Sequence, residues 1–77
     1  MKELHYYGSA DLVARMKDSA GREYDIVKTT YTLDVWQHID RGGTRLYTMF
    51  ADITLPEVIQ TLAVDFGFVE LVEGEVV

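Results

Sequence analysis

The sequence predicts an α+β fold: an antiparallel β-meander of three to four strands with one amphipathic helix packed on one face. Three observations predict it. Residues 54–67 carry apolar side chains at helical spacing, residues 11–53 and 68–72 alternate as strands do, and two Asp-to-Gly turn signals divide the strand region. With 77 residues, the chain is expected to form one small domain over 1–77, in the order β-β-β-α-β.

The helix expected over residues 54–67 has clear signals at both ends. Thr54 with Glu57 three residues later forms a capping box, and Pro56 stands in the first turn, where its missing N–H group costs nothing. Gly67 can adopt the left-handed conformation that ends a helix. One face forms an apolar stripe of Leu55, Val58, Ile59, Leu62 and Phe66, and the other presents Glu57, Gln60, Thr61 and Val64.

The first part of the chain allows two interpretations. Lys2–Tyr7 is expected to form a short strand. In residues 11–28, a helix capped by Ser9 and ended by Gly21 competes with a hairpin whose loop is 19–21. The two interpretations make opposite predictions for residues 11–17, so the cross-strand register decides between them.

The hairpin register favours the strand interpretation. It pairs Lys17 with Glu23 and Arg15 with Asp25, which are opposite charges directly across the two strands. The same register places the apolar residues on one face, with Met16 beside Tyr24 and Ala14 beside Ile26. A register that satisfies both charge and burial predicts a hairpin.

The second strand is predicted to run on to residue 39 as one long element. Tyr24 and Ile26 share one parity, whereas Tyr31, Leu33, Val35 and Ile39 share the other. We therefore expect a bulge or bend near residues 28–30.

A second turn is expected at Asp40–Thr44, because Asp40 and Gly43 repeat the spacing of the first turn. A three-residue loop pairs Asp40 with Thr44, and the register then sets Val35 opposite Met49, Leu33 opposite Ala51 and Tyr31 opposite Ile53. We expect the helix to cover this face. A last short strand is expected over Phe68–Val72.

The opposite face of the sheet is expected to hold a small apolar patch. One helix is about 10 Å wide and strands lie about 4.8 Å apart, so the helix covers two or three strands on one side only. The predicted patch contains Trp36, Leu46 and Phe50 among Thr32, Asp34, His38, Thr48 and Asp52. Either the N-terminal segment with Tyr6 and Tyr7 covers this patch, or another chain does.

The negative charge is concentrated in the last third of the chain. The formal net charge is −6, yet residues 1–45 contain equal numbers of acidic and basic residues. Residues 46–77 contain no Lys or Arg and six acids: Asp52, Glu57, Asp65, Glu70, Glu73 and Glu75. Such a distribution repels phosphate backbones and attracts basic surfaces, so direct nucleic-acid binding is not expected. A face that only keeps the protein in solution is the alternative.

The residues give no indication of enzymatic chemistry. The chain has no cysteine, its serines are Ser9 and Ser19 in turn positions, and His5 and His38 have no metal-ligand spacing. The glycines of residues 41–45 are explained by the hairpin turn rather than by phosphate binding. We expect no cofactor and no metal. With no apolar run of membrane-spanning length and no signal-peptide core, we expect a cytoplasmic protein that does not bind membranes.

In size, acidity and lack of catalytic residues the chain resembles the small phage-encoded inhibitors of bacterial defence, the anti-CRISPR group among them. The resemblance implies a non-enzymatic inhibitor in the cytoplasm of a bacterial or phage-infected cell, which occupies the basic, nucleic-acid-binding surface of a partner protein. It carries no motif. From the residues, the predicted partner-binding set is Asp34, Trp36, Leu46, Phe50, Asp52, Glu57, Asp65, Glu70 and Glu73. The alternative is a homodimer or assembly subunit that pairs through the open sheet face.

Overall fold

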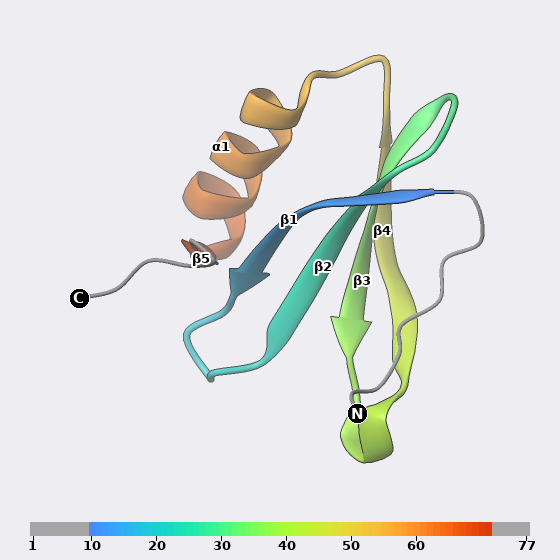
Figure 1. Ribbon diagram of the computed structural model, residues 1–77. Coiled ribbons are helices and arrows are strands. Elements are labelled where there is room, and N and C mark those ends of the chain that lie inside the picture. The colour runs from blue at the N-terminus through green and yellow to red at the C-terminus, as the bar shows by residue number, and fades with distance from the viewer. Residues whose placement is uncertain (1–9, 72–77) are drawn as a thin grey trace.

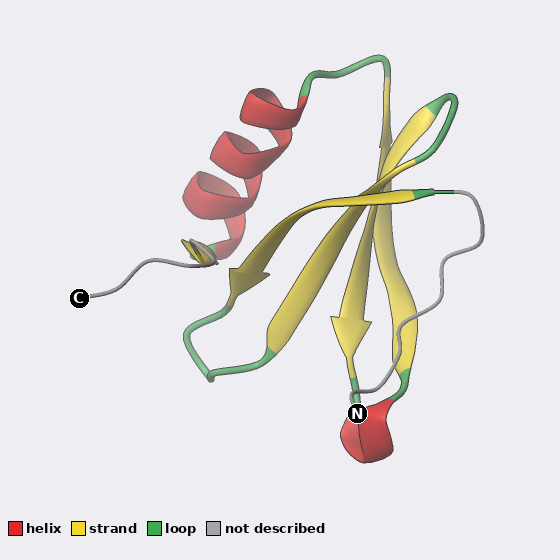
Figure 2. Ribbon diagram, in the orientation of Figure 1, coloured by secondary structure: helices red, strands yellow, loops and turns green. Residues whose placement is uncertain are grey.

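The computed structural model describes residues 10–71, as a five-stranded antiparallel sheet with one helix against one face (Figure 1). In chain order the elements are β1 Asp11–Lys17, β2 Glu23–Lys28, β3 Thr32–His38, a 3-10 turn at Asp40–Gly42, β4 Thr44–Ala51, α1 Leu55–Phe66 and β5 Val69–Leu71. The strand order across the sheet is β4-β3-β2-β1-β5 (Figure 2). The predicted α+β class is confirmed. The strand predicted at Lys2–Tyr7 lies outside the described residues.

The first hairpin has the predicted register. Arg15 pairs with Asp25, and Met16 pairs with Tyr24, so the helix interpretation of residues 11–17 is wrong. The turn is held by the carboxylate of Asp18, whose Oδ1 accepts the backbone N–H groups of Ala20 and Arg22, each at 2.9 Å. Local turn chemistry and cross-strand charge therefore agree on one structure.

The chain reverses at Thr29–Tyr31, so the single long strand predicted over residues 22–39 is wrong. The N–H of Thr29 donates to the carbonyl of Thr32 at 2.9 Å, and Thr29 Oγ1 accepts the N–H groups of Tyr31 and Thr32 at 3.2 and 3.0 Å. These bonds form a threonine-based turn that needs no Gly or Pro. The change of parity marks this turn, and Tyr31 lies at its tip, 83% exposed, rather than under the helix.

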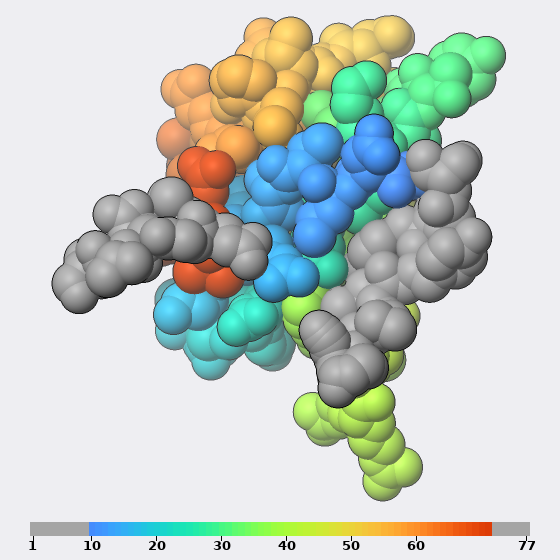
Figure 3. All heavy atoms as spheres, in the orientation of Figure 1, coloured from blue at the N-terminus to red at the C-terminus, as the bar shows by residue number. Residues whose placement is uncertain are grey.

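The predicted register of the second hairpin is also wrong. His38 pairs with Thr44, so residues 39–43 form the loop and Asp40 has no strand partner. The prediction treated Gly43 as the counterpart of Gly21, which is left-handed, but the left-handed residues of the second loop are Arg41 and Gly42, with φ of 73° and 79°. Figure 3 shows the two turns at 29–31 and 40–42 projecting from opposite ends of the molecule.

Two β-bulges shape the sheet around the helix. In β1 the register shifts between Leu12 and Ala14. In β4 it shifts by one residue, as Val35 pairs with Thr48 and the next residue, Trp36, pairs with Leu46. The extra residues are Val13 and Tyr47, and both contribute to the helix side of the sheet. A bulge places two successive side chains on one face and increases the local twist.

The second bulge inverts the predicted faces of residues 48–51 in β4, whereas Leu46 keeps its predicted face. Phe50 pairs with Leu33 and packs against the core, whereas Met49 is 51% exposed. The prediction that Phe50 and Thr48 lie on the open face beside Trp36 is therefore wrong. The prediction assigned the faces of β4 by strict alternation, starting from a loop that was two residues too short on the β3 side. Strict alternation also leaves no place for the extra residue at position 47.

The helix follows its sequence signals. The Oγ1 atom of Thr54 accepts the N–H of Glu57 at 3.4 Å, and the Glu57 carboxylate accepts the N–H of Thr54 at 3.0 Å, which confirms the capping box. Gly67 ends the helix with φ of 74°. The inward residues Val58 and Leu62 have no exposed surface, and Val64 points outward as predicted.

The helix carries the chain from one edge of the sheet to the other. β4 is one edge strand, and after α1 the chain returns as β5 beside β1 (Figure 1). The described part of the predicted last strand is thus confirmed, although Phe68 precedes it and is buried. The core lies between helix and sheet and consists of Met16, Tyr24, Ile26, Leu33, Val35, Val58, Leu62 and Phe68.

Candidate protein-interaction surfaces

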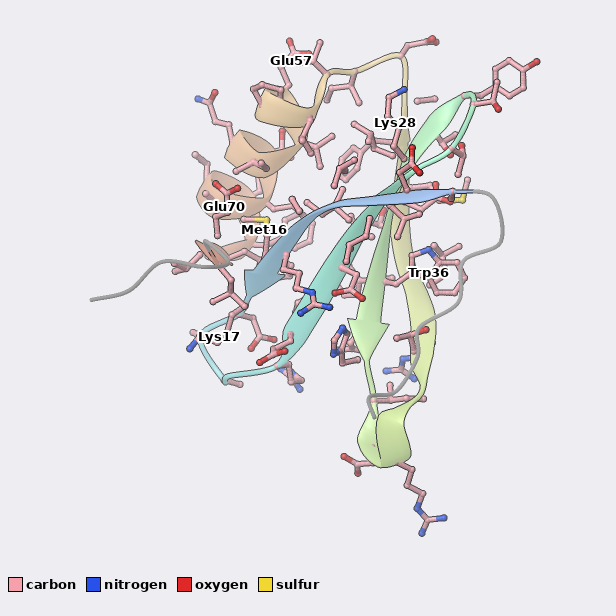
Figure 4. The ribbon with its side chains drawn as sticks, in the orientation of Figure 1. Met16, Lys17, Lys28, Trp36, Glu57 and Glu70 are labelled. Carbon is pink, nitrogen blue, oxygen red and sulfur yellow. The ribbon has the colours of Figure 1, made fainter. Side chains whose placement is uncertain are left out.

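The sheet face opposite α1, here called the outer face, carries part of the predicted patch. Trp36 pairs with Leu46 across β3 and β4, and Asp34 pairs with Met49 on the same face. Figure 4 shows Trp36 on the side of the sheet away from the helix. Leu46 and Met49 are 44% and 51% exposed, and Trp36 is half-buried. The structure thus brings Asp34, Trp36 and Leu46 together, with Met49 in the place predicted for Phe50.

The outer face is not uniformly open. Asp25 and Val27 of β2 lie on it, because they pair with Trp36 and Asp34, yet they have 0% and 1% exposed surface. Exposed large apolar side chains occur on the strands to either side instead, at Leu46 and Met49 on β4, Leu12 on β1 and Val69 on β5. The outer face is therefore closed over β2 and exposes apolar side chains on the strands to either side.

A polar cluster crosses the middle of the outer face. The buried carboxylate of Asp25 has Arg15 Nε at 3.3 Å and His38 Nε2 at 2.9 Å from the same oxygen, Oδ1. The Nδ1 atom of His38 lies 3.8 Å from Glu23 Oε1. Sequence reasoning found the Arg15–Asp25 pair but treated His38 as a strand residue. The cluster joins β1, β2 and β3, which gives it a structural role.

The helix layer, defined as residues 52–71, is the anionic part of the described chain. Its charged side chains are Asp52, Glu57, Asp65 and Glu70, all exposed, and it contains no Lys or Arg. Residues 10–51 balance six acids against six cations, namely Arg15, Lys17, Arg22, Lys28, Arg41 and Arg45. Asp52, Glu57 and Asp65 lie on α1 or before it, and Glu70 lies on the adjoining edge strand β5, so the uneven charge distribution along the sequence becomes an uneven distribution over the fold.

The four carboxylates of the helix layer are not equivalent. Glu57 is engaged in the capping box, where hydrogen bonds from the backbone and side chain of Thr54 lower the pKa of its carboxyl. Asp52 lies in the preceding loop with a φ of 58°. Asp65 stands in the last turn of α1, which has no basic residue. Glu70 lies on β5, at the end of the helix away from Glu57 (Figure 4), and Glu73 lies outside the described residues.

An aromatic cluster that sequence reasoning did not identify lies at the end of the helix near Gly67. The ring of Tyr47 is 5.1 Å from that of Tyr24 and 6.0 Å from those of Phe66 and Phe68, centroid to centroid. Tyr24 and Phe68 are buried, whereas Tyr47 and Phe66 are 41% and 44% exposed. The signal in the sequence is the Phe-Gly-Phe segment at residues 66–68, but its partner on β4 follows only from the bulge.

Buried polar side chains connect this cluster to the first turn. Arg45 Nε donates to Gln37 Oε1 at 3.0 Å, Gln37 Nε2 donates to the Tyr24 hydroxyl at 3.2 Å, and that hydroxyl donates to Asp18 Oδ2 at 2.9 Å. Burial raises the pKa of Tyr24, and its bond to Asp18 adds to the shift. The chain of bonds fixes Tyr24 under Tyr47.

Shallow hollows lie on both sides of β1 in the described part of the chain. One, of about 540 Å³, is lined by the threonine turn and the segment before α1, including Lys28, Leu33 and Ile53. The other, of about 470 Å³, lies along β1 and β5 and includes Arg15, Glu23 and Glu70. Within residues 10–71, no three His, Asp or Glu side chains are grouped to hold a metal ion, and the helix is not long and apolar enough to cross a bilayer.

Comparison of the chain with known protein families, with curated proteins and with solved structures finds no match.

Proposed function

We propose that this protein is a non-enzymatic interaction module whose anionic helix layer binds the basic surface of a partner protein. In this proposal it inhibits the partner by occupying a surface that otherwise binds nucleic acid, as small anti-CRISPR-like inhibitors do. The observation that carries the proposal is the uneven distribution of charge: residues 10–51 are balanced, and the helix layer has only acidic charged side chains. All described cations lie on β1–β4 and their turns, whereas the helix layer presents four exposed carboxylates and no cation.

The position of Asp65 supports a role beyond solubility. The C-terminal end of a helix carries a partial negative charge, so an acidic side chain in the last turn destabilises the helix by about 0.3–1 kcal/mol. Asp65 is exposed and occupies that turn without a basic neighbour in it. A carboxylate that only improved solubility would cost less at most other exposed positions. Binding to a cationic surface is a physical reason to place it there.

The experiment is a capture of partners from a bacterial lysate with the immobilised full chain, at low and high salt. The test variant is Asp65→Lys/Glu70→Lys, and its charge-matched control is Asp11→Lys/Asp40→Lys, which changes two exposed acids of the sheet layer by the same amount. We expect a partner that high salt releases, that the test variant loses and that the control retains.

The inhibitory part of the proposal needs a second measurement. Duplex DNA or RNA added in excess should displace the captured partner if both occupy one surface. Equal loss of the partner from both charge variants would mean that binding depends on net charge alone and not on the position of the carboxylates. Capture that neither salt nor either variant changes would contradict the proposal.

A second candidate function is that of a homodimer or assembly subunit. Its supporting observation is the pair of exposed apolar side chains Leu46 and Met49 on the outer face of β4, an edge strand of the sheet. This candidate predicts a concentration-dependent mass in sedimentation that Met49→Lys abolishes and that salt hardly changes. A constant monomer mass would exclude it.

A further inference from the structure

The aromatic cluster at the C-terminal end of α1 presents two ring surfaces to solvent. Tyr47 and Phe66 are each exposed by about two-fifths, and their ring centroids lie 6.0 Å apart with the rings inclined at 71°. Both rings are supported from below by buried Phe68, which stacks on Tyr24 at 4.3 Å. The support makes this a preformed surface rather than two independent side chains. It is called the aromatic pad below.

Four sources of negative potential lie at the same end of the helix. The faces of aromatic rings are negative, and the C-terminal end of a helix carries about half a negative charge. Asp65 adds a carboxylate in the last turn of α1. Glu70 adds another, because it pairs with the core residue Met16 and so leaves β5 on the helix side, the same side as Phe68.

The nearest cation on β4 is already engaged. Arg45 lies two residues before Tyr47, and its Nε donates to the buried amide of Gln37 at 3.0 Å. Arg22, near the Tyr24 hydroxyl, is engaged as well, because its Nε donates to Asp18 Oδ2 at 2.9 Å, and residues 46–71 contain no Lys or Arg. The charge of the pad is therefore complementary to a cation supplied from outside.

We propose that the aromatic pad receives an arginine side chain of the partner, with its guanidinium over Tyr47 or Phe66 and close to Asp65 and Glu70. A guanidinium suits the site better than an ammonium, because it is planar, more weakly hydrated and able to stack on a ring while it bonds to a carboxylate. This inference rests on the proposed function and names the chemistry by which the helix layer would recognise its basic partner.

The test uses two blocked peptides of equal shape, acetyl-Gly-Arg-Gly-Arg-Gly-amide and the same peptide with citrulline in place of arginine. Each is titrated into the full chain while NMR follows the ring signals of Tyr47 and Phe66. We expect the arginine peptide to shift these signals and the citrulline peptide to leave them in place. The variants Phe66→Leu and Asp65→Asn should each weaken binding by about two- to fivefold, and Asp52→Asn should leave it unchanged.

Three results would overturn the inference. Equal signal shifts with the citrulline peptide would mean that the pad binds neutral side chains. Shifts confined to the signals of Leu46 and Met49 would place the peptide on the outer face. An unchanged affinity of the Phe66→Leu variant would mean that the rings take no part in recognition. The lysate capture tests the proposed function separately. A partner lost with Asp65→Lys/Glu70→Lys but retained by Phe66→Leu leaves the proposed function standing without this inference.

Discussion

The Nε2 atom of His38 lies 2.9 Å from Oδ1 of Asp25, a carboxylate with no exposed surface. Arg15 approaches the same oxygen from the other neighbouring strand, at 3.3 Å. We expect Arg15→Met to lower the free energy of unfolding by about 1–2 kcal/mol, because it keeps the aliphatic stem but removes one partner of the buried Asp25 carboxylate while His38 remains. Urea denaturation measures this. The matched control Lys17→Met, an exposed residue on the same strand and face, should change it by no more than about 0.5 kcal/mol.

The pH dependence of stability should contain a contribution from Asp18. Burial on its own raises the pKa of this carboxyl, but hydrogen bonds from Arg22, Tyr24 and Ala20 outweigh burial and lower it from 3.8 to about 2. A carboxyl with a lowered pKa binds its proton more tightly in the unfolded chain. Its stabilising contribution is therefore complete above about pH 4 and is lost as the pH falls towards 2.

Comparison of the wild type with Asp18→Asn isolates this contribution. The wild type should be the more stable protein at pH 7, and the difference should shrink between pH 4 and pH 2, the window set by the two pKa values. Thermal denaturation followed by circular dichroism across this range measures it. A difference that stays constant with pH would mean that the carboxylate charge does not stabilise the turn.

The first hairpin and the helix could be predicted because their signals are local. Asp18 and Gly21 set the first loop, opposite charges at 15 and 25 set its register, and the capping box starts the helix. The reversal at Thr29–Tyr31 was missed because threonine turns lack the Gly, Pro or Asn that usually mark a turn. The bulge at Tyr47 was missed because packing of the strand against Tyr24 and the helix specifies it, not the alternation of β4.

The candidate site, like the fold, could be predicted only in part. The concentration of acids after residue 45 needs only the sequence. Trp36 and Leu46 lie on one face as predicted, although Trp36 was expected opposite Thr48 and in fact pairs with Leu46. The inward position of Phe50 and the contact between Tyr47 and Phe66 depend on the bulge, so no pattern within β4 reveals them. Surfaces that combine distant segments require the fold.

The corrected register of β4 makes a sharp prediction about two neighbouring residues. Phe50 packs against the core, so Phe50→Ala should lower the free energy of unfolding by about 2 kcal/mol, less than a fully buried Phe because its side chain is half-buried. Met49 is 51% exposed, and Met49→Ala should cost no more than about 0.5 kcal/mol. Urea denaturation of both variants decides the register, since a larger loss at Met49 would restore strict alternation.

The two sides of α1 should differ just as clearly. Leu62 has no exposed surface, and Leu62→Ala should lower the free energy of unfolding by about 2–5 kcal/mol through lost burial and the cavity left behind. Val64 is 73% exposed, and Ala is the better helix former. The Val64→Ala variant should therefore leave the free energy of unfolding unchanged or raise it by at most about 0.5 kcal/mol. Similar losses at both positions would mean that the outward side of the helix is covered.

Asp65 should be a residue at which stability and binding change in opposite directions. Asp65→Lys places a cation at the negative end of α1, so it should raise the free energy of unfolding by about 0.3–1 kcal/mol and raise the melting temperature. The same change replaces a carboxylate with a like charge facing a basic partner, and binding of the partner captured at low salt should weaken by roughly tenfold. Asp40→Lys, in the 3-10 turn, changes the net charge equally but should not weaken that binding. A variant that gains stability and binds as tightly as the wild type would show that Asp65 has no part in recognition. The proposal that the helix layer binds a basic partner would then lose its most specific support.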